Sequence, residues 1–145
     1  MKLRNYDLEP LILYLNKMKL AGKASRMRTR FINILTEKYK LFKDEHMQLI
    51  KEYANLDEDG NPKIIVRDGQ RVFDIKDELA FNKEFNELLF EEVIIEENEV
   101  NKNMLLSVRD SILNSEIEVS EEEAFLYNEW CEQFENIYKN EGDVN

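Results

Sequence analysis

The sequence predicts a mainly helical α+β protein, with about five helices including one long helix, and a small antiparallel β-hairpin or three-stranded sheet. Two observations carry this prediction. Apolar residues recur at helical spacing along most of the 145-residue chain. The pair Asp68-Gly69 separates two short runs rich in β-branched residues, which is typical of a tight hairpin turn. The length suits one domain over residues 1–145, and we expect the tail to fray from about residue 141.

Two helices are predicted before residue 54. The first runs to about Leu20, with Pro10 tolerated in its opening turn. Gly22 interrupts the pattern, and Ser25 can cap a second helix that continues to Tyr53, about 45 Å at 1.5 Å per residue. One apolar stripe marks the buried side of this long helix: Met27, Phe31, Ile34, Leu35, Phe42, Leu49 and Tyr53.

The middle of the chain predicts the sheet and a third helix. The turn-forming segment NLDEDGNP ends the long helix, and Ile64–Val66 then face Val72–Phe73 across the Asp-Gly turn. Asp74 or Asp77 can cap the third helix, whose apolar face contains Phe81, Phe85, Leu88 and Leu89. The β-branched run 93–95 predicts a short strand, and a continued helix is the alternative.

Two further helices complete the predicted fold. Apolar spacing indicates a fourth helix through Val100, Met104, Leu105, Val108 and Ile112. Ser120-Glu121-Glu122-Glu123 has the pattern of a capping box that opens a fifth helix. Its inward residues are expected to be Tyr127, Trp130, Cys131, Phe134 and Tyr138.

Charge is divided unevenly along the chain. Residues 1–53 carry twelve Lys/Arg against six Asp/Glu, and the rest carries eight against twenty-five, so a net +6 segment precedes a −17 segment. The basic residues gather before Thr36, and four of them are candidate contact residues: Lys23, Arg26, Arg28 and Arg30. They border the apolar stripe, which favours pairing with the acidic half or stems lying over the core; nucleic-acid contact is the alternative.

A second and weaker apolar line follows the long helix away from its main stripe. It consists of Ile32, Tyr39, Met47 and Ile50. A helix buried on one side does not need this line. The line therefore either meets the rest of the domain or forms a surface for another subunit. In the second case the long helix would join the subunits of a homo-oligomer.

The sequence nominates no catalytic residue, metal ligand or cofactor site. The loop at Asn55 imitates the start of an EF-hand, but its twelfth position is Val66 where a bidentate Glu is required. His46 is the single histidine, which excludes a metal site made of two histidines. The four glycines are too scattered for a phosphate-binding loop. The lone Cys131 fits a reducing cytoplasm. No apolar stretch approaches the ~20 residues of a membrane span. We therefore expect a protein that is not an enzyme and does not enter a membrane.

Two segments resemble a family of small uncharacterised proteins from phages and prophages of Gram-positive bacteria. They are Lys19 to Pro62, which contains LAGKASRMRTRFINILTEKYKLFKDEHMQLIKEYANLDEDGNP, and FNKEFNELLFEEVII at residues 81–95. The resemblance implies a viral protein in the host bacterial cytoplasm, with virion association as a further possibility, and a phage or host protein as partner. It brings no activity or site residue. We expect a protein–protein interaction or assembly factor; the alternative is a nucleic-acid-related regulator, either a basic-patch binder or an acidic DNA mimic.

Overall fold

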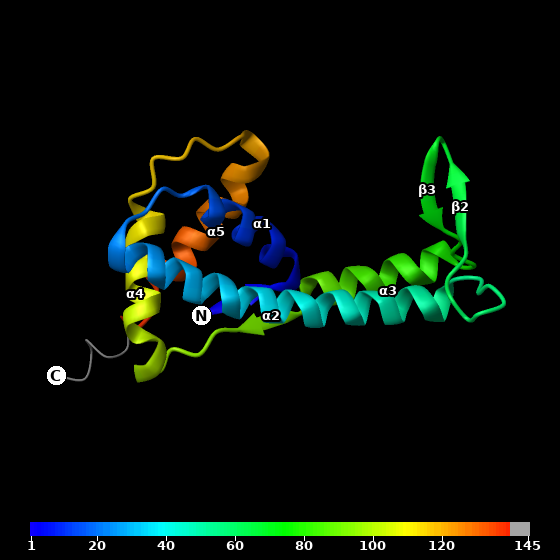
Figure 1. Ribbon diagram of the computed structural model, residues 1–145, viewed down its shortest axis with the longest axis horizontal. Coiled ribbons are helices and arrows are strands. Elements are labelled where there is room, and N and C mark those ends of the chain that lie inside the picture. The colour runs from blue at the N-terminus through cyan, green and yellow to red at the C-terminus, as the bar shows by residue number, and fades with distance from the viewer. Residues whose placement is uncertain (140–145) are drawn as a thin grey trace.

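The computed structural model describes residues 1–139 and has five helices and two small antiparallel sheets within them (Figure 1). This confirms the predicted fold class; the predicted fraying from residue 141 lies outside the described residues. The elements in chain order are β1 (Lys2–Arg4), α1 (Asn5–Lys17), α2 (Gly22–Tyr53), β2 (Ile64–Arg67), β3 (Gln70–Phe73), α3 (Glu78–Phe90), β4 (Glu92–Ile94), α4 (Glu99–Leu113) and α5 (Glu121–Glu135).

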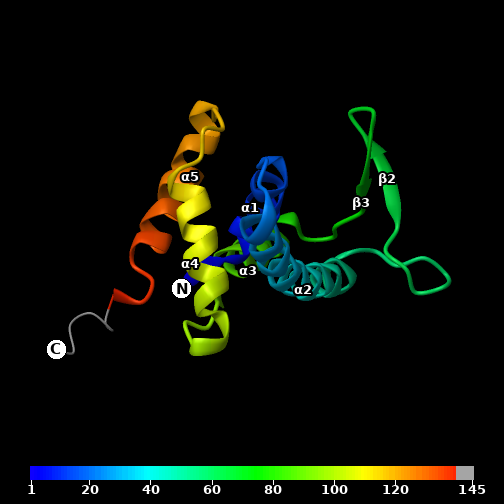
Figure 2. The ribbon, with the colours of Figure 1, turned by 60° about the vertical axis from the view of Figure 1, so that its left-hand side comes forward.

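The body of the protein is formed by α1, α4, α5 and the first half of α2 (Figure 2). Its centre consists of side chains without exposed surface, including Phe31 on α2, Leu105 on α4 and Phe134 on α5. The rings of Phe31 and Phe134 meet edge to face, with centroids 5.8 Å apart. Val100 was predicted to share the buried face of α4 but is 89% exposed, so that face begins at Met104.

An arm projects from this body. The second half of α2 lies beside α3, and both helices extend away from the body toward the β2–β3 hairpin (Figure 1). We define the arm as residues 50–84, because no residue in this range belongs to the core cluster of the described chain or packs against it. At the root of the arm, a seam of stacked rings joins the two helices: Phe42, His46, Phe81 and Phe85.

The β2–β3 hairpin forms at the predicted turn. Its strands pair antiparallel with Ile65 opposite Val72. Asp68 and Gly69 have φ values of 51° and 78°, the positive angles of a two-residue type I′ turn. The hairpin is tied to the helices at its base, where the Lys76 N–H donates to the Tyr53 carbonyl at 2.7 Å and residues 54 and 75 form a β-bridge.

Gly69→Val should loosen this hairpin by about 1–2 kcal/mol, because a β-branched residue disfavours positive φ. No atom lies within 4 Å of the added Cβ, so the cost comes from the backbone alone. Hydrogen exchange at the hairpin amides should show protection reduced by about 5- to 30-fold. Gln70→Val, which places the same side chain in β3, is the control, and an equal loss in both variants would contradict the turn assignment.

A second sheet joins the first residues of the chain to the segment that follows α3. β1 pairs antiparallel with β4, with Leu3 opposite Val93. The strand prediction at residues 93–95 is therefore confirmed, whereas a single three-stranded sheet is wrong, since the hairpin stands apart from β1 and β4. β1 was not predicted because three residues with a single buried side chain are too few to reveal a period in the sequence.

Two boundaries near the first turn differ from the sequence prediction. α1 ends at Lys17 and not at Leu20, and α2 begins at Gly22 with Ala21 as its N-cap, so Ser25 lies inside the helix and caps nothing. Of the later helices, α3 is capped by Asp77, one of its two predicted caps, and α5 by the predicted Ser120, whereas the N-cap of α4, Asn98, was not predicted. The Asp77 side chain accepts from the Ala80 N–H, and the Ser120 hydroxyl accepts from the Glu123 N–H.

Candidate functional site

The far end of the arm carries exposed aliphatic side chains. Ile64 and Val66 are 51% and 72% exposed on β2, and Leu79 at the start of α3 is 84% exposed. Alternation along the strand places Ile64 and Val66 on one face, opposite Phe73 and Arg71 on β3. We call Ile64, Val66, Arg71 and Leu79 the arm tip. Isolated apolar side chains are common on surfaces, but a group of them on a projecting element is typical of a contact site.

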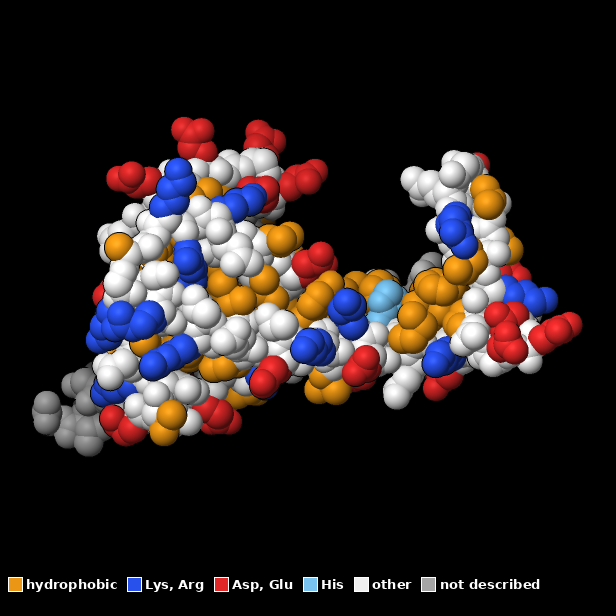
Figure 3. All heavy atoms as spheres, viewed as in Figure 1, with side chains coloured by type: hydrophobic (Ala, Val, Ile, Leu, Met, Phe, Trp, Pro, Cys, Tyr) orange, Lys and Arg blue, Asp and Glu red, His pale blue; other side chains and the backbone are white. Residues whose placement is uncertain are grey.

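A cleft lies between the hairpin and the helices that support it. It encloses about 430 Å³ and is lined by His46, Ile50, Val72, Ile75 and Phe81, with the Arg67–Glu78 ion pair at its wall. Figure 3 shows apolar side chains gathered beside the histidine at the foot of the hairpin. The His46 ring stacks on Phe85 with centroids 4.2 Å apart, and burial lowers its pKa. Stacking makes His46 part of the packing of the arm.

The single histidine and the single cysteine do not form a catalytic pair. His46 lies among the rings of the arm, whereas Cys131 is half-buried on α5 in the body. Burial raises the pKa of the Cys131 thiol, which keeps it protonated and unreactive at neutral pH. A nucleophile-and-base arrangement needs the two groups within hydrogen-bond reach, and these two are on separate parts of the fold.

The loop that imitates an EF-hand is closed by its own side chain. One carboxylate oxygen of Asp57 accepts from the N–H groups of Asp59 and Asn61, both at 2.9 Å. The Asp57 carboxylate therefore serves to shape the turn from α2 into the hairpin. Within residues 1–139 no group of three or more His, Cys, Asp or Glu side chains is placed to hold a metal ion.

The four predicted cations lie in the first turns of α2, at the end of that helix remote from the arm. Lys23, Arg26 and Arg30 are exposed, and none of the four takes part in an ion pair among the described residues. Arg28 instead donates to the carbonyls of Leu15 and Met18, where α1 ends. Ion pairs with the acidic half are therefore not found among the described residues. Arg28 is held at the end of α1, and Arg30 lies beside the buried Met27, with its Nη1 4.0 Å from the Met27 Sδ.

The second apolar line is mostly occupied by the protein itself. Ile32 and Tyr39 pack against the core, and Ile50 is 5% exposed beneath the hairpin. The Tyr39 hydroxyl donates to Glu9 on α1 at 3.0 Å. Met47 is 39% exposed and is the member that stays open to solvent. This line chiefly joins α2 to the rest of the domain.

A groove between α1 and α5 was not found from the sequence. It holds about 200 Å³ and is lined by Pro10, Leu13, Tyr14, Val119, Leu126 and Trp130, with Glu9, Lys17 and Glu123 at its edge. We call it the α1–α5 groove. Trp130 is buried against the groove and donates from Nε1 to the buried Asp7 carboxylate at 3.1 Å. Burial raises the pKa of Asp7, although hydrogen bonds from Arg4 N–H and Trp130 oppose this effect.

The fold and its surfaces define a mainly helical α+β protein with a projecting arm (Figure 1). The family described as protein of unknown function (DUF1617) matches residues 1–141, and the chain belongs to this family. Neither a curated protein nor a solved structure matches it. Within the described residues, none of the helices is both long and apolar enough to span a bilayer.

Proposed function

We propose that this protein is a non-enzymatic interaction or assembly factor that binds a protein partner through the arm tip. One observation carries the proposal. Residues 50–84 form an ordered projection that adds nothing to the core of the body, yet they present exposed aliphatic side chains at its end. The arm tip replaces most of the contact surface suggested by the sequence, since Ile32, Tyr39 and Ile50 are engaged within the fold.

The free-energy cost of ordering the arm supports this assignment. Ordering the backbone costs roughly 1–2 kcal/mol per residue, and a two-stranded hairpin alone is marginally stable in water. Here the ring seam and the hydrogen bonds at the hairpin base hold the arm in place, including Asn55 Nδ2 to the Asp74 carboxylate at 2.9 Å. A preorganised hairpin with exposed edges and aliphatic side chains suits recognition of another protein, because little further ordering is needed on binding.

The resemblance to phage proteins makes a phage or host protein the expected partner. A bacterial host cytoplasm, with or without incorporation into a virion, is the corresponding proposal for location. Membership in a family without an assigned activity leaves the partner to be found by experiment.

The partner can be tested with a matched pair of variants in cells that produce the protein. Val66→Asp places a charge on the arm tip, and Leu41→Asp places one on α2 outside the arm, where Leu41 is 61% exposed. Both side chains are exposed, so both variants should fold. We expect Val66→Asp to reduce capture of the partner by about tenfold or more, a change of ~1.4 kcal/mol. Equal capture by Val66→Asp and Leu41→Asp would contradict an interaction through the arm tip.

A nucleic-acid-related regulator is the second candidate, favoured by the exposure of Lys23, Arg26 and Arg30 outside any ion pair of the described chain. We expect the wild type to bind neither duplex nor single-stranded DNA at physiological salt, because the chain carries −11 overall. Replacing all four cations with Gln should lower stability mainly through the contacts of Arg28 with the end of α1, so Arg28→Gln alone should reproduce most of the loss. Binding with a salt slope near 0.9 per neutralised phosphate, lost in the fourfold variant, would instead favour this second function.

A further inference from the structure

We propose that the arm tip of one molecule docks into the α1–α5 groove of a second copy of this chain. The inference rests on the proposed function and names the partner of the arm. It joins two surfaces that lie on different parts of the molecule and that match each other in size, apolar character and charge.

The groove has the size and lining for aliphatic side chains. Its volume of about 200 Å³ lies below the roughly 300–1,000 Å³ of small-molecule pockets. Pro10, Leu13 and Tyr14 on one side face Val119, Leu126 and Trp130 on the other. Leu13 is 55% exposed, so apolar surface remains open to solvent there. Burial of one or two aliphatic side chains would remove that surface from water.

The surroundings of the groove are acidic. Residues 110–138, which include α5 and the segment before it, contain nine Asp or Glu and no Lys or Arg. Glu9 and Glu123 line the groove directly, against a single cation, Lys17. A positively charged apolar element is therefore favoured over a negatively charged one at this site.

The hairpin that carries most of the arm tip has a net positive charge, whereas the whole arm contains six Lys or Arg against nine Asp or Glu. Residues 63–76 contain four Lys or Arg against two Asp. Arg71 lies opposite Val66 on the face that also contains Ile64, and it takes part in no ion pair among the described residues. This face thus offers two aliphatic side chains for the groove and a guanidinium for its acidic edge. An Arg at the edge would also fix the orientation of the hairpin.

The two surfaces of one molecule stand apart. The hairpin lies at the end of the arm, the groove lies in the body, and the face in Figure 3 is hollowed between them. The ring seam and the bonds at the hairpin base hold the arm away from its own groove. The groove therefore receives the hairpin of another molecule. Because unlike surfaces meet, each contact leaves one hairpin and one groove open, and repetition builds a ring or a filament.

Sedimentation velocity on the full chain, which measures the average mass as a function of protein concentration, tests this contact. The hairpin face is small, so the interface should fall below about 1,200 Å² and association should appear at high micromolar concentration. We expect the average mass of the wild type to rise with concentration and to fall back as salt is added. A wild type that stays monomeric throughout would overturn the inference.

Two variants that each remove one surface give the sharper test. Val66→Asp disables the arm tip, and Leu13→Asp disables the groove; both positions are more than half exposed, so the fold should persist. Each variant alone should associate at least tenfold more weakly. An equimolar mixture should form dimers and stop there, because one copy keeps a working hairpin and the other a working groove. Failure of the mixture to dimerise, or growth beyond the dimer, would contradict a head-to-tail contact.

Matched controls separate this inference from the proposed function. Leu41→Asp lies outside both surfaces and should associate like the wild type. Arg71→Glu should weaken association and Glu123→Arg should restore it in the mixture of the two variants, since the pair exchanges charges across the contact.

If the wild type is monomeric while Val66→Asp still loses its partner in cells, the partner is another protein and only this inference fails. If Val66→Asp changes neither result, both fail.

Discussion

Trp130→Ala should lower the free energy of unfolding by about 3–5 kcal/mol. Trp130 is 3% exposed and packs beside Tyr14, with ring centroids 5.7 Å apart. Its indole N–H is also the side-chain partner of Asp7, a carboxylate that is 4% exposed. Alanine would therefore leave a cavity between α1 and α5 and remove a hydrogen bond from a buried acid.

The two contributions can be separated with Trp130→Phe. Phenylalanine keeps much of the ring volume but cannot donate to Asp7, so we expect a smaller loss of about 1–3 kcal/mol. Urea unfolding followed by circular dichroism is the measurement, because Trp130 is the sole tryptophan. Phe125→Ala on the same helix is the control, since Phe125 is 77% exposed and should change stability by less than about 0.5 kcal/mol. An unchanged urea midpoint for Trp130→Ala would contradict its place in the core.

Local signals in the sequence predicted much of the fold. The Asp68-Gly69 turn needs only the conformational preferences of two adjacent residues, and it forms where expected. β1 escaped prediction because its partner lies about 90 residues away and no local pattern encodes such a pairing. The start of α2 was misplaced because Ser25 has the chemistry of an N-cap, whereas the chain enters the helix through Ala21.

The arm is harder to predict because α2 keeps one apolar period along its whole length. Residues of that stripe as far as Phe42 belong to the core cluster or pack against it, while the rings of Phe42 and His46 also stack on Phe85 of α3. Helical spacing indicates a buried side but cannot distinguish one partner from two. A usable signal for the arm tip does exist in the strand Ile64-Ile65-Val66, which is apolar on both faces. A hairpin buried on one face would alternate with polar residues.

The exposed cations show the same limit for the candidate site. Charge counting correctly found a basic region at the start of α2, but it could not show which cations the fold uses. Arg28 points to the carbonyls at the end of α1, whereas Lys23 and Arg26 remain exposed. Side chains two residues apart on a helix, such as Arg26 and Arg28, face different directions, so their roles separate once the neighbouring helix is in place.

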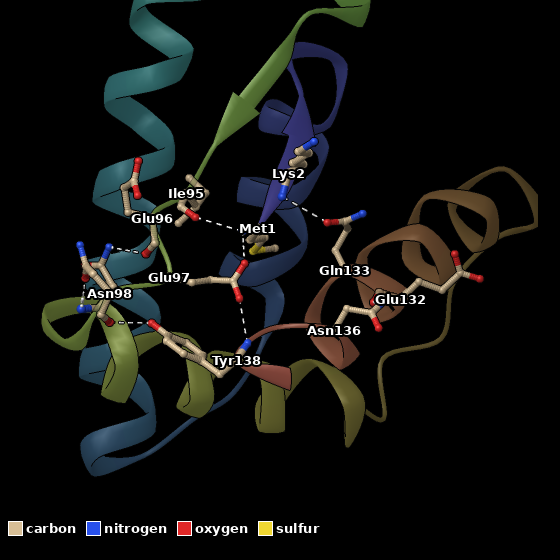
Figure 4. A network of polar contacts seen from close by, with 11 residues as sticks. Met1, Lys2, Ile95, Glu96, Glu97, Asn98, Glu132, Gln133, Asn136 and Tyr138 are labelled. Carbon is tan, nitrogen blue, oxygen red and sulfur yellow. Dashed lines mark hydrogen bonds and ion pairs between the residues drawn. The ribbon is translucent and has the colours of Figure 1, made fainter. Parts of the chain in front are cut away.

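Glu97→Ala should lower the free energy of unfolding by about 3 kcal/mol. Met1 is buried, with 8% of its surface exposed, and its ammonium donates to the Glu97 carboxylate and to the Ile95 carbonyl, the latter at 3.1 Å (Figure 4). The same carboxylate accepts from the Tyr138 N–H at 2.8 Å, so it joins the first residue to the segment after α5. Removing one partner of a buried ion pair costs about 3–5 kcal/mol, and the carboxylate is 32% exposed, which places the loss at the lower limit.

The contribution of Glu97 should also depend on pH in a definite direction. Burial alone raises the pKa of Glu97, but hydrogen bonds from the Met1 ammonium and the Tyr138 N–H outweigh burial, so the pKa is lowered. A carboxylate with a lower pKa in the folded state stabilises the protein fully above its unfolded pKa of about 4.3, and this stabilisation is lost as pH falls through the folded pKa. The stability difference between wild type and Glu97→Ala, measured by urea unfolding in the chain that begins at Met1, should therefore shrink between about pH 6 and pH 3. The exposed neighbour variant Glu96→Ala should show little loss at either pH, and a Glu97→Ala deficit that stays constant with pH would exclude the ion pair as its source.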